Sequence, residues 1–178
     1  KQMPSLPLAK ALLERLGLPD TRYYALLPGD ELKIESLMKK TQASVIQFER
    51  ASDKGRASAR KQALAQLRTL EDHIEPDDDI TRQFILRHKA TLGKEDGPYT
   101  MEEELEILRE AICLTVPDFD EEEIDQGLYS MNESAVINQI AVAYALGEEH
   151  EKAIAVYRQL LSYTKANCRR LAQYAGRL

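Results

Sequence analysis

The sequence predicts an all-α fold of stacked antiparallel helical hairpins, and three observations lead to that prediction. The chain is 43% hydrophobic and 30% charged, with Glu, Lys, Arg, Ala and Leu abundant, and these side chains lose little rotamer freedom in a helix. Residues that favour strands are sparse, with aromatics at only 6%. Apolar residues recur at helical spacing in segments joined by short loops, which favours neighbouring helices that pack in pairs.

The N-terminal segment predicts one short helix followed by a connector. Residues 5–16 place apolar side chains on one helical face, and Gly17 stands where glycine commonly ends a helix. A short helical or turn-like segment is expected over 21–27. The break Pro28-Gly29-Asp30 follows, and Asp30 is expected to cap the next helix.

Two long helices, about 31–52 and 56–74, are predicted to form the first hairpin, which spans 31–75. The turn between them is expected at Asp53-Lys54-Gly55. Each helix carries an apolar stripe at helical spacing, formed by Ile34, Leu37, Met38, Val45 and Phe48 and by Ala63, Leu64, Leu67, Leu70 and Ile74.

A second hairpin is predicted over 80–116. Its first helix, 80–92, follows the run Asp77-Asp78-Asp79 and ends at Gly93. Thr100 and Glu103 match a capping box, in which each side chain accepts a hydrogen bond from the other residue's backbone. That box starts a helix to about residue 116, and a brief helix is expected over 121–128.

A third hairpin is predicted over 132–164. Ser130 and Glu133 match a second capping box, and the helix 132–146 ends at Gly147. The partner helix, 150–163, is expected to turn five side chains inward, namely Ala153, Ile154, Tyr157, Leu160 and Leu161. A last helix over 166–178 is expected to begin another unit.

The segment 134–167 resembles a tetratricopeptide repeat, a helical hairpin of about 34 residues. The repeat's large and small apolar positions are matched by Ile137, Ile140, Ala141, Tyr144, Ala153 and Tyr157. Lys165 stands where the family has a late proline. The resemblance implies a right-handed superhelix whose first helices line a concave face. The alternative is an ordinary amphipathic hairpin within a bundle.

The beginning of the chain resembles the closing helix of a phage-repressor-type helix-turn-helix domain. That resemblance rests on Lys1-Gln2-Met3-Pro4-Ser5-Leu6 with Leu13, Leu16 and Gly17. A helix-turn-helix tail before tetratricopeptide-like hairpins is similar to the peptide-responsive regulators of Gram-positive bacteria, the group that includes PlcR, PrgX and Rgg. Further stretches that look like that group are 14–19, 23–24, 81–87, 92–99 and 137–141.

This resemblance implies three parts: a last helix of a DNA-binding domain over 1–17, a connector over 18–30 and a repeat domain over 31–178. The recognition helix, which would enter the major groove, would lie before Lys1, so the chain is expected to be a fragment. The formal net charge is −6, and no basic cluster suited to phosphate contacts occurs. DNA contact is therefore expected only through the missing domain.

Several other functions find no support in the sequence. His73, His88 and His150 fall in different hairpins without catalytic or metal-binding spacing, so no enzyme activity, metal or other cofactor is expected. The acidic run 77–79 is explained by the positive helix N-terminus that follows it. Cys113 and Cys168 are far apart and are expected to be inert thiols. Without a signal peptide or membrane-length apolar run, we expect a cytoplasmic protein that does not enter a membrane.

The family resemblance implies a short peptide ligand on the concave face. Asn138 is the first candidate contact, because its amide offers both a donor and an acceptor to a peptide backbone; its alternative is a solvent-facing residue or local cap. Phe84, Arg87 and His88 are expected on the same side, with Arg87 either meeting a peptide carboxylate or pairing with an acid from another helix. Apolar ligand side chains are expected at Val142 and Leu146. Gln42 and Gln47 are weaker candidates.

The leading hypothesis is the sensor and dimerisation domain of a homodimeric, quorum-sensing transcription regulator. Peptide binding would favour one curvature of the stack and so reorient the DNA-binding domains. One alternative is a tetratricopeptide adaptor that binds another protein and has no DNA role. Another is an inhibitor or phosphatase of a response regulator, as in the related Rap proteins, although no catalytic side chain for it is identified.

Overall fold

The computed structural model describes residues 6–15, 29–94 and 97–175, and within these ranges the protein is helical with no strand. The all-α prediction is confirmed for them. The segment expected over 21–27 and the stop expected at Gly17 lie outside the described residues. No helix in the described ranges combines the length and apolar character needed to cross a bilayer.

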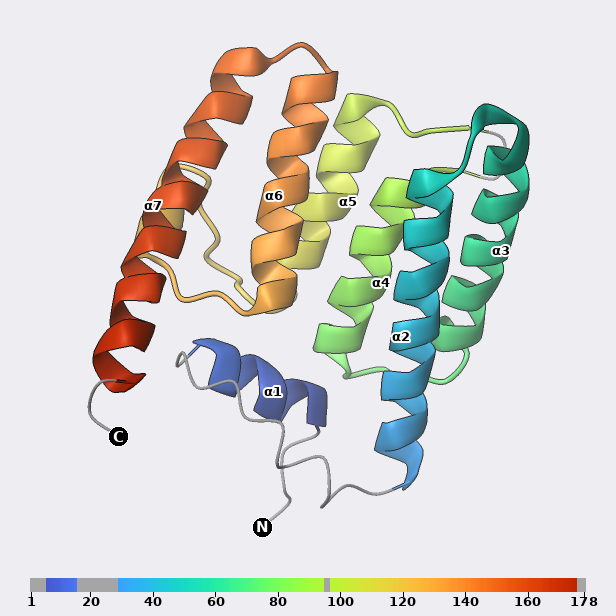
Figure 1. Cartoon of the computed structure of the whole chain (residues 1–178), viewed down its shortest axis with the longest axis horizontal. Helices are drawn as coiled ribbons and strands as arrows, with labels where there is room; N and C mark the ends of the chain where they lie inside the picture. Colours follow the sequence, from blue (N-terminus) through green and yellow to red (C-terminus); the bar gives the residue numbers. More distant parts are fainter. Residues whose placement is uncertain (1–5, 16–28, 95–96, 176–178) are drawn as a thin grey trace.

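The helices follow one another as three long pairs preceded by a short helix. Their bounds are α1 Leu6–Arg15, α2 Gly29–Arg50, α3 Asp53–Glu71, α4 Asp79–Leu92, α5 Met101–Cys113, a 3₁₀ turn η2 Ile124–Gln126, α6 Met131–Leu146 and α7 His150–Ala175. The pairs α2/α3, α4/α5 and α6/α7 pack closely, and α3 packs on α4 as α5 does on α6. Figure 1 shows α2, α4 and α6 running in the same direction in one row, while α1 lies across the row at its lower end.

Local signals in the sequence set several of these helix ends. Both predicted capping boxes form: Glu103 N donates to Thr100 Oγ1 at 3.3 Å, and Glu133 N donates to Ser130 Oγ at 3.3 Å. Asp78 caps α4 by accepting from Thr81 N at 3.0 Å. Gly93 ends α4 with φ of 75°, and a Cβ there would lie 2.5 Å from Gly97 O. Any other residue at position 93 would therefore be strained.

The first hairpin differs from prediction at its ends. Because α2 begins at Gly29, Asp30 lies in its first turn and is not the cap. The prediction of a turn at Asp53-Lys54-Gly55 is wrong, since α3 already begins at Asp53. The residue before it, Ser52, has an extended backbone. Asp53 is favourable in the first helical turn because its charge faces the positive end of the helix dipole. The connection between α2 and α3 is therefore only two residues long, 51–52.

The last hairpin differs more. The helix α7 runs unbroken to Ala175, so residues 166–175 continue α7 instead of starting another unit. The segment lacks the late proline of the repeat family, and Lys165 does not interrupt a helix. Only η2 forms where a helix was expected over 121–128. The inward face of α7 is also rotated from prediction: Ile154, Tyr157 and Leu161 are exposed, whereas Val156 and Tyr163 are buried.

Two hydrophobic clusters form the interior, and α4 contributes to both. One lies among α2, α3 and α4, with Phe48, Ala63, Leu67, Leu70 and Ile85 among its buried members. The other lies among α4, α5, α6 and α7, with Ala90, Leu108, Ile112, Ile140 and Ala153 among its buried members. Small residues such as Ala111, Ala141 and Ala153 are almost fully buried and allow neighbouring helices to approach closely.

Candidate functional site

A groove runs along the row formed by α2, α4 and α6. It consists of two hollows of about 410 and 450 Å³, and Gln42, Arg87 and Ala135 line both. The first hollow also touches α1, through Lys10, Ala11 and Glu14, and is called the α1 half. The second also touches α3, through Arg56 and Arg60, and is called the α3 half. Because three lining residues are shared, the two halves form one continuous surface.

Each of the three helices lines the groove with one stripe of side chains. The stripes are Glu35, Met38, Gln42, Val45 and Glu49 on α2; Ile80, Phe84, Arg87 and Thr91 on α4; and Asn132, Ala135, Asn138, Val142 and Leu146 on α6. Spacings of three and four residues place these side chains on one face of each helix. The same helical period that turns one stripe into the core thus turns a neighbouring stripe toward the groove.

The structure brings all six predicted contact residues onto this groove. Phe84 lines the α1 half, Arg87 lines both halves, and His88, Asn138, Val142 and Leu146 line the α3 half. Phe84 and His88 are buried in the floor, whereas Asn138 and Leu146 are exposed. Gln42 also lines the groove, but Gln47 is exposed and is not part of its lining.

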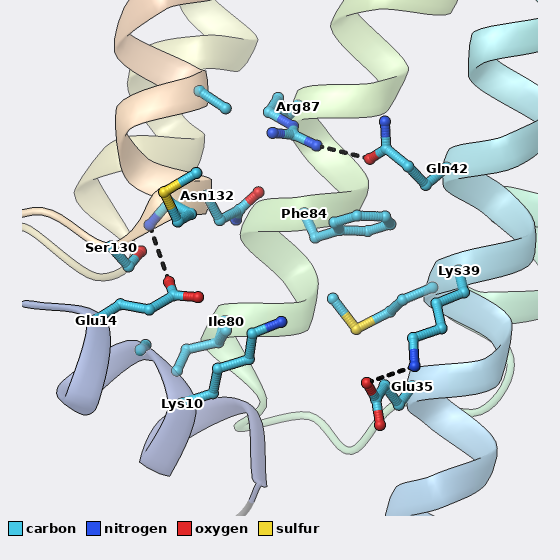
Figure 2. A pocket seen from close by; sticks show the side chains of 14 residues that line it. Lys10, Glu14, Glu35, Lys39, Gln42, Ile80, Phe84, Arg87, Ser130 and Asn132 are labelled. Carbon is cyan, nitrogen blue, oxygen red and sulfur yellow. Dashed lines mark hydrogen bonds and ion pairs between the residues drawn. The ribbon is translucent and has the colours of Figure 1, made fainter. Parts of the chain in front are cut away.

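At the centre of the groove Arg87 is held by neutral partners. Its Nη2 donates to Gln42 Oε1 at 3.1 Å and its Nε donates to His88 Nδ1 at 3.2 Å, and its guanidinium lies 5.5 Å from the centre of the Phe84 ring. Figure 2 shows Arg87 and Gln42 facing each other across the groove. No carboxylate of the described residues forms an ion pair with Arg87, so the alternative of an inter-helix acid is not found there.

Burial governs the ionisation of this central group. It lowers the pKa of Arg87 to about 10, against a smaller opposing effect of the Glu49 charge. Burial, together with the positive charge of Arg87, holds the pKa of His88 well below its usual value. His88 is therefore neutral, with Nδ1 accepting from Arg87 and Nε2 donating to Gln42 Oε1 at 2.9 Å. Both ring nitrogens are occupied, so His88 positions Arg87 and Gln42 and has no free hydrogen-bonding group for a ligand.

Two asparagines on α6 have spare hydrogen-bonding capacity. Asn138 is exposed, and its side chain makes no hydrogen bond within the described part of the chain. Asn132 donates to Gln83 Oε1 at 2.8 Å, but its own buried Oδ1 has no partner. A ligand N–H would satisfy that acceptor. Sequence reasoning missed Asn132, although its spacing from Ala135 and Asn138 places it on the same helical face.

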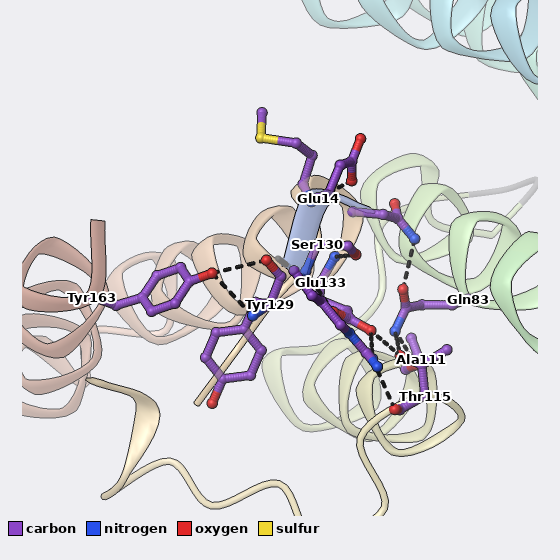
Figure 3. A network of polar contacts seen from close by, with 11 residues as sticks. Glu14, Gln83, Ala111, Thr115, Tyr129, Ser130, Glu133 and Tyr163 are labelled. Carbon is purple, nitrogen blue, oxygen red and sulfur yellow. Dashed lines mark hydrogen bonds and ion pairs between the residues drawn. The ribbon is translucent and has the colours of Figure 1, made fainter. Parts of the chain in front are cut away.

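A buried carboxylate, Glu133, holds α1 in place and with it one wall of the α1 half; Figure 3 shows the polar contacts around Glu133. Glu133 is 1% exposed and accepts from Arg15, from Thr115 Oγ1 at 2.6 Å and from Ser130 N at 2.6 Å. Arg15 also donates to Thr115 O at 3.0 Å, and Glu14 accepts from Met131 N at 2.9 Å. These bonds attach α1 to the start of α6 and to the residues after α5. Sequence reasoning missed this arrangement, because no local pattern joins positions 118 residues apart.

The ionisation of Glu133 reflects the same contacts. Burial alone would raise its pKa, but the hydrogen bonds from Arg15, Thr115 and Ser130 outweigh burial and lower it. The carboxylate is therefore charged at neutral pH and each of its oxygens accepts hydrogen bonds. A further polar link extends from this site, since Gln83 Nε2 donates to Thr115 Oγ1 at 2.7 Å and to Ala111 O at 3.0 Å.

Comparisons of the chain with models of protein families, with curated proteins and with solved structures find no match. Among the residues that the structure describes, no group of three or more side chains is arranged to hold a metal ion.

Proposed function

We propose that the chain is the peptide-sensing and dimerisation part of a DNA-binding transcription regulator, with a tetratricopeptide-like superhelical stack. The observation that carries the peptide-binding part is the continuous groove along α2, α4 and α6, onto which all six residues selected from the sequence converge. Helical stacks of this kind use extended concave surfaces for binding. The DNA-binding part rests on the resemblance of residues 1–17 to the end of a helix-turn-helix domain.

The lining of the groove suits an extended peptide. A peptide backbone presents alternating donors and acceptors. On one side of the groove Asn138 offers both a donor and an acceptor, and on the other side Gln42 offers its Nε2 donor, since its Oε1 already accepts from Arg87 and His88. Apolar surface for ligand side chains is supplied by Met38 and Phe84 in the α1 half and by Val45 and Val142 in the α3 half. Apolar walls with a few positioned polar groups are the usual composition of ligand sites.

The position of α1 offers a route from the groove to a preceding domain. Lys10, Ala11 and Glu14 form a wall of the α1 half, and the adjacent Arg15 of the same helix binds Glu133. A peptide in this half would contact the helix that resembles the last helix of a helix-turn-helix domain. Its binding would favour the α1 orientation that gives the better contacts, which is a population shift between orientations.

Calorimetric titration of the chain with the short peptides secreted by its source organism tests this function. We expect one peptide to bind and Asn138→Ala to weaken its binding by about 1–2 kcal/mol, the net value of a hydrogen bond that leaves its partner unsatisfied. Gln47→Ala, which removes an exposed amide outside the groove, is the matched control and should bind as the wild type does. Equal affinity in Asn138→Ala would remove this residue from the site.

Two further measurements test the rest of the proposal. The codons upstream of Lys1 should encode the remainder of a helix-turn-helix domain, and a start codon immediately before Lys1 would rule that domain out. Sedimentation analysis of the full regulator should give a dimer, and a monomer at all concentrations would contradict the dimerisation role.

A further inference from the structure

The α3 half of the groove concentrates positive charge in a chain of formal net charge −6. Three arginines line it: Arg56 and Arg60 from the first turns of α3 and Arg87 from α4. None of the three forms an ion pair with a carboxylate in the described part of the chain. The same half contains two acids, Glu49 and Glu104, so three cations face two anions that do not bind them.

The three guanidinium groups rest on aromatic rings. Arg56 and Arg60 lie 5.0 and 5.4 Å from the centre of the Phe48 ring, and Arg87 lies 5.5 Å from that of Phe84. Both phenylalanines are buried and belong to the core cluster of α2, α3 and α4. Contact with an aromatic face holds a guanidinium in place without neutralising it, so the N–H groups that no protein atom accepts stay available to an anion; in Arg87 these exclude Nε, which donates to His88.

One of these donors is already removed from water without a partner. Arg60 Nε is buried and makes no hydrogen bond. A buried donor of this kind is unfavourable unless a partner satisfies it. Desolvation also raises the pKa of the half-buried Glu104, as expected for an acid that none of the three arginines binds. The two carboxylates that line this half, Glu49 and Glu104, therefore do not complete the site.

The anion that suits this place is a single carboxylate. A guanidinium forms two parallel hydrogen bonds with a planar carboxylate. A polyanion such as a nucleic acid would also meet Glu49 and Glu104 in the same half, and their charges would repel it. The surrounding amides of Gln42, Asn138 and Gln139 are suited to a peptide backbone leading to that carboxylate.

We propose that the Arg56, Arg60 and Arg87 cluster is a subsite that binds a carboxylate of the peptide, either its C-terminus or one acidic side chain. This inference rests on the peptide-binding function proposed above. It assigns the peptide a charge and a direction: the carboxylate lies in the α3 half, and the uncharged part of the peptide extends toward the α1 half.

Three pools of synthetic heptapeptides distinguish the two sources of the carboxylate. The first lacks Asp and Glu and has a free C-terminus, the second lacks them and is amidated, and the third is amidated and carries one Glu. Each pool is passed over the whole chain, and retained peptides are quantified by mass spectrometry. Enrichment of the first pool over the second identifies the C-terminus, and enrichment of the third over the second identifies a side chain.

The remaining outcomes overturn the inference in two distinguishable ways. Equal retention of all three pools leaves peptide binding intact and removes the carboxylate subsite alone. Retention of no pool contradicts both the groove function and the subsite.

Substitution then locates the subsite on the retained peptide. Arg60→Gln should weaken binding of the carboxylate form by about 10-fold or more, the usual size for hydrogen bonds to a charged group, and should leave binding of its neutral analogue nearly unchanged. Arg158→Gln, at an exposed arginine of α7 outside the groove, is the matched control. If Arg60→Gln weakens binding of the carboxylate form and of the neutral form equally, Arg60 supports the shape of the groove and does not recognise the carboxylate.

Discussion

Glu133 and Arg87 are two charged groups largely removed from water, and the protein treats them in opposite ways. Glu133 receives bonds from Arg15, Thr115 and Ser130, whereas Arg87 is held only by neutral Gln42 and His88. A buried charge with a full set of partners fixes the arrangement of the segments that supply them. A charge left without a counter-ion lowers stability and is available to a ligand. Glu133 thus holds together the segments at one end of the groove, whereas Arg87 at its centre has no carboxylate partner among the described residues.

The largest loss of stability is expected when Glu133 and its hydrogen bonds are removed. Glu133→Ala removes the acceptor for Arg15 and Thr115 and one half of the α6 capping box, so the free energy of unfolding should fall by about 2–4 kcal/mol. That range lies below the value for a fully buried pair because the Arg15 side chain is 27% exposed. Urea unfolding measures the loss.

Glu103→Ala is the matched control for that experiment, because Glu103 occupies the same position in the other capping box but forms its contacts at the surface. Its loss of stability should be clearly smaller. Equal losses in the two variants would show that Glu133 acts only as a capping residue.

The free energy of unfolding, measured as a function of pH, should show separate contributions from His88 and Glu133, because each begins to lower stability at a different pH. The pKa of His88 is depressed in the folded state, so below about pH 6.5 the unfolded chain takes up a proton that the folded chain does not. Stability should therefore decrease as the pH falls through this range, by at most about 1.4 kcal/mol per pH unit.

Two histidine variants show which residue causes this decrease in stability between about pH 6.5 and about pH 5. His88→Gln should abolish most of the loss above about pH 5, whereas His150→Gln, at an exposed residue, should retain it. The depressed pKa of Glu133 adds a second loss, which begins only below the ordinary glutamate value of about 4.3. Urea midpoints measured from pH 7.5 to 3.5 show whether the two steps occur.

The smallest effect is expected at the unpaired charge. Arg87→Met removes a desolvated cation and keeps an apolar chain of similar length, so the free energy of unfolding should change by less than about 1 kcal/mol. The pKa of His88 should rise toward its usual value, because the Arg87 charge contributes to its depression. Chemical denaturation and NMR titration of His88 measure the two changes. A large destabilisation would mean that Arg87, like Glu133, holds neighbouring helices together.

The sequence predicted those features that depend on neighbouring residues. The two capping boxes and the stop at Gly93 form as expected, because each is decided within a few residues. The stripe of α6 that carries Asn138 and Val142 could also be predicted, since helical period alone places side chains on one face. The same period explains why the six candidate residues share a groove once α4 and α6 lie side by side.

What escaped prediction depends on how segments distant in sequence pack. The start of α3 brings Arg56 and Arg60 into the groove only because its hairpin lies against α4. The contact between Arg15 and Glu133 joins two residues that are 118 positions apart in the chain. The face of α7 that is buried was wrong for a related reason: periodicity identifies an apolar stripe but not which edge of it the neighbouring helix covers, so Ile154 and Tyr157 are exposed.

The position of α4 between the two hydrophobic clusters has a mechanical consequence. Of the described helices, α4 alone contributes buried side chains to both clusters, through Ile85 and Leu92 on one side and Ala90 on the other. The packing of α2 and α3 is therefore coupled to that of α5, α6 and α7 through this one helix. In the proposed function, a peptide that reaches from α2 to α6 would cross α4 and would contact helices of both clusters at once.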